Sequence, residues 1–235
     1  MPGAQMAARY ATHVPLMEDQ MTAQAYGSGA MHLPGCFSMA QQRMLAAQCQ
    51  ALLEGDVPGY VPVVRGGGKM HVRMLCLGRH WNGRTYQYEQ TRSDFDGLAP
   101  PPIPENLEQM AREIARAASM SLIPDVCILN YYEGDGRMGL HQDKDEGPRS
   151  IAEGWPVVSI SIGDTARFLF GGPRRRDPVE TILLQSGDAF VFGGEARLRF
   201  HGVSRIIPGT APPELAMAGR FNLTFRQSDG SHPNG

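Results

Sequence analysis

Two residues with metal-binding side chains, His141 and Asp143, lie in the segment LNYYEGDGRMGLHQDKDE, residues 129–146. They follow an apolar run at 126–129 that is typical of a β-strand, and side chains two positions apart in a strand point to the same side. One imidazole nitrogen and one carboxylate oxygen could therefore bind one metal ion. With a second histidine they would form the 2-His-1-carboxylate site that binds non-haem Fe(II) and leaves positions open for oxygen. Alone, an H-x-D triplet is more often a hydrogen-bonded pair on a surface.

The third ligand of such a site would be a histidine from a later strand. His201 and His232 are the two histidines that follow Asp143 in the sequence. His232 lies in the polar stretch 227–235, which we expect to be frayed. His201 is far enough along the chain for several strands to bring it opposite His141. The sequence therefore predicts His201 as the third ligand.

A strand with an unusual charge pattern is predicted at RFNLTFR, residues 220–226. Side chains alternate between the two faces of a strand. One face would carry Arg220, Asn222, Thr224 and Arg226, and the apolar residues between them would lie on the other. An arginine fork binds a carboxylate through two parallel hydrogen bonds, so the polar face suits a dicarboxylate co-substrate. In isolation, the same pattern is equally typical of an exposed cationic strand edge.

Two helices and a series of short strands are expected to position these residues. Ser38 and Gln41 form a capping box at the start of a helix that ends near Gly55, and a second helix is predicted at 105–118. Short strands are then predicted at 157–162, 168–170, 180–184, 189–192, 197–200 and 220–225. Such a series after an α/β leader indicates an α+β protein with a jelly-roll core, whose mouth commonly holds a metal.

The composition is that of an ordinary globular protein, with 235 residues, 42% of them hydrophobic and 20% charged. The net charge of −2 argues against a strongly basic nucleic-acid binder, but it allows an enzyme with a local basic rim. We expect no membrane span and no secretory signal, since no suitable apolar run is present. The four cysteines are scattered without metal-site spacing, which favours reduced thiols in a cytoplasmic protein.

Residues 78–88 combine Trp81, two tyrosines, His80 and two arginines. Surfaces that stack on bases and bind phosphates use aromatic and cationic side chains at this density. The alternative is a hairpin whose aromatic side chains cover the core, and the local sequence alone favours this alternative.

Together the motifs resemble the AlkB family of Fe(II)/2-oxoglutarate-dependent dioxygenases. The similarity extends from about residue 33 to residue 227 and is strongest in ILNYY, LHQDKDE, SISIGDTARFLFGG, LLQSGDAFVFGGEARLRFHGV and RFNLTFRQ. The resemblance implies a double-stranded β-helix, which is a jelly roll, with an N-terminal α/β lid that recognises the nucleotide. The expected division is a disordered arm at 1–30, the helix and lid at 31–104, the core at 105–227 and a disordered tail at 228–235.

The resemblance also implies roles for individual residues. Iron would be bound by His141, Asp143 and His201. The co-substrate 2-oxoglutarate would be bound by Asn130, Tyr132, Arg220, Asn222 and Arg226. The substrate would be contacted by Trp81, Tyr86, Asp145 and Arg175. Asp145 matches the position that contacts the exocyclic nitrogen of the base. Trp81 is slightly displaced from the tryptophan that stacks on the base, so Tyr86 or His80 could take that place.

The implied activity is oxidative demethylation of N-alkylated bases of the 1-methyladenine and 3-methylcytosine type in DNA, with RNA left open, for the repair of alkylation damage. It would require Fe(II), 2-oxoglutarate and O2, and release formaldehyde, succinate and CO2. The expected partner is alkylated single-stranded DNA or RNA, bound by a cytoplasmic monomer without an obligate protein partner. Alternatives are the same chemistry on tRNA, a protein side chain or a small molecule, a binding module without activity, and a cupin-type isomerase. The choice between DNA and RNA, and the main lesion, stay open.

Overall fold

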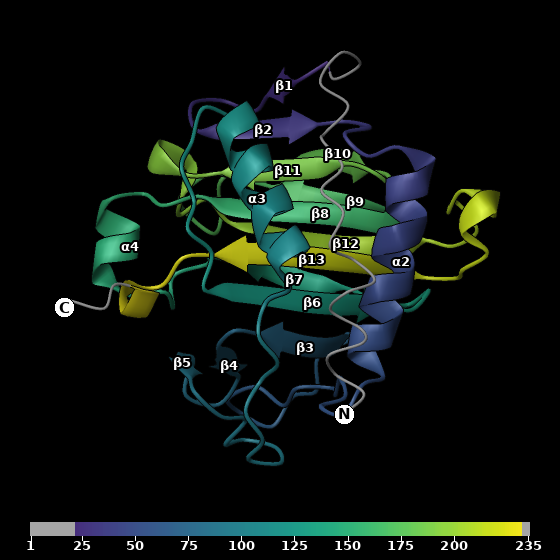
Figure 1. Cartoon of the computed structure of the whole chain (residues 1–235). Coiled ribbons are helices and arrows are strands. Elements are labelled where there is room, and N and C mark those ends of the chain that lie inside the picture. The colour runs from purple at the N-terminus through teal and green to yellow at the C-terminus, as the bar shows by residue number, and fades with distance from the viewer. Residues whose placement is uncertain (1–21, 232–235) are drawn as a thin grey trace.

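The computed structural model describes residues 22–231, which form two antiparallel β-sheets covered on one side by helices (Figure 1). The larger sheet has the order β1 (Gln24–Ala25), β2 (Ala30–Leu33), β11 (Ala189–Phe192), β8 (Val157–Gly163), β13 (Arg220–Arg226), β6 (Val126–Tyr132) and β3 (Arg73–Leu77). The smaller sheet has the order β10 (Glu180–Leu184), β9 (Thr165–Phe170), β12 (His201–Ile207) and β7 (Met138–His141). A separate hairpin pairs β4 (His80–Asn82) with β5 (Gln87–Glu89).

The strands from β6 to β13 alternate between the two sheets as in a jelly roll. The strands β6, β8, β11 and β13 belong to the larger sheet, and β7, β9, β10 and β12 belong to the smaller one. Apart from the β9–β10 hairpin, each strand is therefore followed by one in the opposite sheet. The predicted α+β fold with a double-stranded β-helix core is confirmed.

Helices α2 (Met39–Leu53) and α3 (Glu105–Ala117) pack on the outer face of the larger sheet (Figure 1). Ser38 caps α2 with the predicted capping box, since its hydroxyl accepts from the amide of Gln41 and its own amide donates to the Gln41 side chain. The apolar face of α3 lies in one buried cluster with Leu129 of β6 and Leu223 of β13. Because Leu223 faces the helices, the residues on either side of it in β13 face the space between the sheets.

Aromatic side chains fill the interior between β9, β10 and β11. Phe168, Phe170, Phe190 and Phe192 are buried there together. The ring centroid of Phe190 lies 5.1 Å from that of Phe168 and 5.0 Å from that of Phe170. This apolar packing occupies one part of the interior, and the polar face of β6 and β13 lines the part beside it.

We expect Phe190→Ala to lower the free energy of unfolding by about 3–5 kcal/mol, because the ring is fully buried and its removal leaves a cavity. Urea unfolding followed by circular dichroism measures the change. Leu183→Ala is the control, since Leu183 is 49% exposed, and it should change the free energy by less than about 0.5 kcal/mol. Equal effects of the two substitutions would contradict the assignment of the aromatic cluster to the core.

Two strand boundaries near the predicted metal ligands differ from expectation. The predicted strand at 197–200 is wrong, because β12 begins only at His201 and a short 3-10 turn, η2 (Gly194–Ala196), precedes it. The cause is that the backbone of Arg197 is helical, and the amides of Arg197 and Arg199 donate to the carbonyls of Gly194 and Ala196, which continues the turn instead of a strand. In addition, β7 ends at His141, so Asp143 lies in the following loop and not in the strand.

The ends of the chain also depart from the expected division. Strand β1 precedes residue 30, and both β2 and β3, which fall in the expected lid region, pair with core strands. Near the C-terminus, the turn η4 (Asp229–Ser231) lies beside α4 (Pro148–Ala152), where the Asp229 carboxylate accepts hydrogen bonds from two α4 amides. Most of the expected arm and tail, 1–21 and 232–235, lies outside the described residues. No helix within 22–231 is long and apolar enough to cross a membrane.

A candidate metal centre and its cavity

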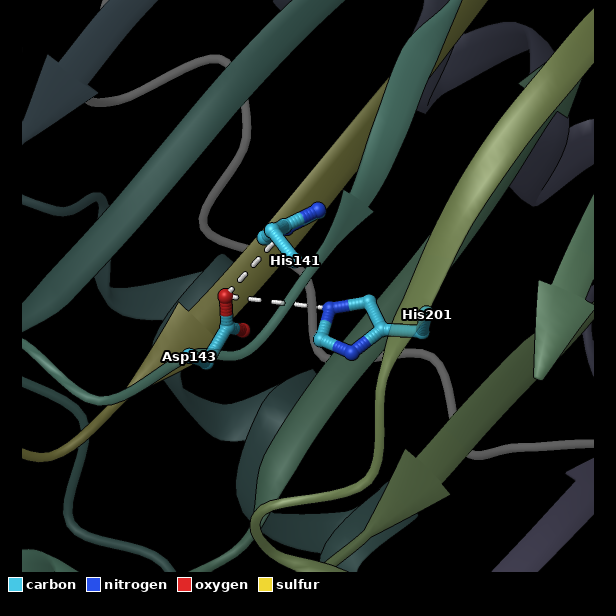
Figure 2. Close-up of side chains that lie close together, drawn as sticks. All are labelled: His141, Asp143 and His201. Atoms are coloured by element: carbon cyan, nitrogen blue, oxygen red, sulfur yellow. Dashed lines mark ion pairs between the residues drawn. The ribbon is translucent and has the colours of Figure 1, made fainter. Parts of the chain in front are cut away.

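Three potential metal ligands meet where β7 and β12 lie side by side (Figure 2). His141 at the end of β7 pairs in register with His201 at the start of β12. Asp143 follows two residues later in the loop, and its Oδ1 lies 3.5 Å from His141 Nε2 and 3.7 Å from His201 Nε2. One ligand atom from each residue lies within 4.8 Å of the other two. Among residues 22–231, this is the one group of three His, Cys, Asp or Glu side chains with such geometry.

Backbone carbonyls fix the orientation of both imidazole rings. His141 Nδ1 donates to the carbonyl of Gly139 at 2.9 Å, and His201 Nδ1 donates to the carbonyl of Arg199 at 3.0 Å. With Nδ1 of each ring occupied by a backbone carbonyl, Nε2 of each ring faces Asp143 and is the atom available to a metal. Metal-bound histidines are commonly held in this way by a second partner.

The carboxylate of Asp143 is oriented by Arg226. Its Oδ2 accepts from Arg226 Nε at 2.9 Å and from Nη2 at 2.7 Å, which leaves Oδ1 facing the histidines. Burial opposes ionisation of Asp143, but Arg226 and His201 hold the pKa of the carboxyl well below its usual range. Burial and the neighbouring His141 lower the pKa of His201 to about 4. A carboxylate and a neutral imidazole are the protonation states that bind a metal.

A cavity of about 770 Å³ opens beside these residues and contains most of the predicted site. From the predicted set, its lining includes His141, Asp143, Asn130, Arg226, Trp81, Tyr86, Asp145 and Arg175. His201, Tyr132, Arg220 and Asn222 do not reach its surface. The structure thus brings together residues from β4, β6, β7 and β13 that are far apart in the sequence.

The predicted 2-oxoglutarate residues share the inward face of β6 and β13. Asn222 lies opposite Asn130, and Arg220 lies opposite Tyr132. Arg220 is buried, and burial lowers the pKa of its guanidinium to about 10. Three buried polar atoms on this face have no hydrogen-bond partner: Asn130 Oδ1, Arg220 Nε and Arg226 Nη1. Since buried polar groups are normally paired, the two free arginine donors fit an anionic ligand such as 2-oxoglutarate.

The hairpin β4–β5 supplies aromatic side chains to the cavity. Trp81 Nε1 donates to Asp145 Oδ2 at 2.8 Å, and the Trp81 and Tyr86 ring centroids are 5.7 Å apart. Trp81 packs on the core, as the alternative interpretation of this segment predicts, and it also lines the cavity. His80 is fully buried and bonded to Asp94, which excludes it as a stacking residue.

Sequence reasoning missed three residues that support the centre. Glu146, Arg197 and Tyr88 form a buried hydrogen-bond network with Asp143 and Arg226. The proximity of Glu146 to Asp143 in the sequence was the one available signal. Arg197 and Tyr88 come from distant elements, and no local pattern indicates where their side chains point.

Comparison with known proteins assigns the chain to a family. Residues 29–226 match the profile of the 2OG-Fe(II) oxygenase superfamily. The chain is 42% identical over 220 residues to "DNA N(6)-methyladenine demethylase ALKBH1C" of Arabidopsis thaliana, covering 85% of this chain and 48% of that protein. It is 38% identical over 169 residues to "Alpha-ketoglutarate-dependent dioxygenase AlkB" of Escherichia coli (strain K12), covering 71% of this chain and 76% of that protein. The solved structure of OsALKBH1 has a TM-score of 0.82 and 40% sequence identity, covering 87% of this chain and 99% of that chain.

The chain spans about half the length of the Arabidopsis relative and about three quarters of the bacterial one. The match to the superfamily profile covers every strand from β2 to β13 and all three potential metal ligands. The chain therefore belongs to the AlkB family of the 2OG-Fe(II) oxygenase superfamily, whose cofactors are Fe(II) and 2-oxoglutarate.

Proposed function

We propose that this protein oxidatively removes methyl groups from nitrogen atoms of bases in nucleic acid. The observation that supports this function best is the composition of the cavity. Its lining combines His141 and Asp143 with the aromatic side chains of Trp81 and Tyr86. A cavity of about 770 Å³ is large enough for one flipped-out base, and such enzymes act on bases taken out of the stack.

The metal and the co-substrate would be held by separate sets of residues. Iron would be bound by His141, Asp143 and His201, and 2-oxoglutarate by Asn130, Tyr132, Arg220, Asn222 and Arg226. When bound, iron and the keto acid supply oxidation of a methyl C–H bond by O2, with succinate and CO2 as by-products. The hydroxymethyl group left on the base nitrogen then dissociates as formaldehyde.

The protein's own side chains would orient the base and exclude water. Trp81 and Tyr86 offer ring faces for stacking, and Asp145 offers a carboxylate to an exocyclic N–H of the base. Arg175, whose Nη1 donates to the carbonyl of Leu140 at 2.8 Å, lies at the cavity with its remaining donors available to a phosphate. The neighbouring Arg174 and Arg176 are exposed, which gives this loop local positive charge in a chain of net charge −2.

Among methylated bases, N6-methyladenine in DNA is the first candidate substrate. Two Arabidopsis relatives at 42% and 43% identity carry the name DNA N(6)-methyladenine demethylase. Asp145 can accept the single N–H that remains on this exocyclic nitrogen. The second candidates are 1-methyladenine and 3-methylcytosine, the substrates that the family resemblance of the sequence implies. Both bases are cationic, so the half-buried carboxylate of Asp145 would attract their positive charge.

The proposed function can be tested with oligonucleotides that each carry one methylated base. The protein is incubated in air with Fe(II), ascorbate and 2-oxoglutarate, and mass spectrometry detects the loss of one methylene mass. The arms are N6-methyladenine, 1-methyladenine and 3-methylcytosine in single-stranded DNA and RNA, together with a methyl-lysine peptide. We expect loss from DNA that depends on 2-oxoglutarate, fastest for N6-methyladenine. Turnover of the peptide alone would overturn the nucleic-acid substrate.

Trp81→Ala should lower kcat/KM for the methylated oligonucleotide by about 10- to 100-fold, because stacking on one aromatic ring contributes about 1–3 kcal/mol per base. Trp155→Ala, which changes the other tryptophan, outside the cavity lining, is the matched control and should keep the wild-type value. Succinate formation without oligonucleotide should be the same in both variants. A Trp81→Ala enzyme with unchanged kcat/KM would show that another side chain stacks on the base.

A further inference from the structure

Two hydrogen bonds fasten the β4–β5 hairpin to the loop that carries Asp143. Trp81 and Tyr88 lie directly opposite each other in the hairpin. Trp81 donates to Asp145, and the Tyr88 hydroxyl donates to Glu146 Oε1 at 3.0 Å. The cross-strand pair thus binds two consecutive carboxylates, of which Asp145 is half-buried and Glu146 is buried. The hairpin that carries Trp81 is therefore attached to the loop at Asp145 and Glu146, the second and third residues after the potential metal ligand Asp143.

Glu146 also connects the two arginines that hold Asp143. Arg197 Nη2 donates to Glu146 Oε2 at 2.8 Å, while its Nη1 donates to the backbone carbonyl of Asp143. Arg226 Nε lies 3.2 Å from Glu146 Oε1 and also donates to Asp143 Oδ2. Each carboxylate oxygen of Glu146 therefore contacts one arginine that also binds Asp143. Arg197 binds the backbone carbonyl of Asp143, and Arg226 binds its carboxylate.

Burial makes these contacts strong determinants of geometry. The side chains of Glu146 and Arg197 are each 2% exposed, and those of Asp143 and Arg226 are 6% and 8% exposed. Two carboxylates face two guanidinium groups, so the four charges balance. A buried charge that loses its partner is costly, which means that removing the charge of Glu146 would leave Arg197 and Arg226 to find other acceptors. Both arginines already donate to Asp143, so a change in their position would move Asp143 as well.

We propose that Glu146 is a positioning residue that holds Asp143 and Arg226 in their ligand-binding arrangement and attaches the hairpin to them through Tyr88. This inference rests on the proposed function, since it concerns the same metal and co-substrate site. In this arrangement the hairpin has two attachments to the metal-binding loop, Trp81 to the half-buried Asp145 and Tyr88 to the buried Glu146.

The first test is a calorimetric titration of the full chain with Mn(II) in the presence of 2-oxoglutarate. Groups that orient metal ligands commonly change metal affinity by about 10- to 100-fold, so we expect the Kd of Glu146→Gln to rise at least about tenfold. Tyr88→Phe removes one hydrogen bond to Glu146 and should raise the Kd by about threefold to tenfold. Tyr131→Phe is the matched control, because its hydroxyl donates to the carbonyl of Ala218 on the other face of the sheet. It should bind Mn(II) as the wild type does.

A residue with a merely structural role would lower stability and leave the affinity of the folded protein for Mn(II) unchanged. Wild-type affinity in both Glu146→Gln and Tyr88→Phe would therefore overturn the inference. If Glu146→Gln does not fold, the Kd of Tyr88→Phe for Mn(II) decides whether the inference holds. Tyr88→Phe should fold, because it keeps every charge of the network.

The second test is the ratio of succinate to formaldehyde with an N6-methyladenine oligonucleotide. We expect Tyr88→Phe to raise this ratio by about threefold or more, because the base would be held less firmly relative to the metal. An unchanged ratio would overturn the link to the hairpin. A wild-type protein that forms succinate and no formaldehyde would instead contradict the proposed base substrate, and the Mn(II) titration would still decide the role of Glu146.

Discussion

Replacing His201 with alanine is expected to abolish both succinate and formaldehyde formation, with a fall in kcat of about 10³-fold or more. His201 supplies one of three ligands, and a bound metal contributes several kcal/mol of transition-state stabilisation, where each 1.36 kcal/mol corresponds to a factor of ten. The measurement is succinate release over time with saturating 2-oxoglutarate. His71→Ala is the matched control, because His71 is exposed and lies outside the cavity lining.

The effect of His201→Ala can also be measured through the thermal stability that a bound metal adds. Mn(II) at about 100 times its Kd should stabilise the wild-type protein by about 2.7 kcal/mol, which raises its melting temperature. The rise should disappear with excess EDTA and should be absent in His201→Ala. If His201→Ala kept both the thermal shift and the turnover, the metal would be bound elsewhere.

Arg226→Ala is expected to combine a large loss of stability with a large loss of co-substrate affinity. The guanidinium binds Asp143 Oδ2 through two donors and lies 3.2 Å from Glu146 Oε1, so its removal leaves two buried carboxylates without this partner. Breaking a buried ion pair costs about 3–5 kcal/mol, which urea unfolding would measure. The free Nη1 also disappears, and we expect the KM for 2-oxoglutarate to rise by about 10- to 100-fold in any folded fraction.

Arg226→Lys separates the two effects. Lysine keeps the charge but cannot bind a carboxylate through two parallel hydrogen bonds, so stability should recover in part while the KM stays raised. Arg112→Lys on the exposed face of α3 is the control, since its pair with Glu108 is a surface ion pair worth about 0.3–0.5 kcal/mol. A wild-type KM in Arg226→Lys would argue against a role of the Arg226 fork in binding 2-oxoglutarate.

The predictable parts of this protein are those governed by local periodicity. Alternation in 220–226 predicts that Leu223 and Arg226 lie on opposite faces of the strand, and the structure confirms this, with Leu223 toward the helices and Arg226 at the cavity. The Ser38 capping box fixes the start of α2 from two residues alone. His201 was predictable as a ligand because few histidines follow Asp143, and the structure brings it beside His141.

The parts that sequence reasoning misplaced depend on contacts between distant residues. Asp143 is aimed at the histidines from a loop, where its position follows from Arg226 and Arg197 and not from strand alternation. The start of β12 is delayed because the backbone of Arg197 stays in the turn that begins with η2, which local propensity does not reveal. Tyr88 reaches Glu146 across 58 positions of sequence, and only the docking of the hairpin on the core brings them together.

The metal site and the base-binding cavity can be tested together by a crystal structure with Mn(II), 2-oxoglutarate and an oligonucleotide carrying N6-methyladenine, grown without oxygen. We predict that the metal is bound by Nε2 of His141, Oδ1 of Asp143 and Nε2 of His201, with the carboxylates of 2-oxoglutarate on Arg220 and Arg226. The methylated base should lie in the cavity beside Trp81, with its exocyclic nitrogen at Asp145. A metal bound without these three ligands, or 2-oxoglutarate away from both arginines, would contradict the proposed site.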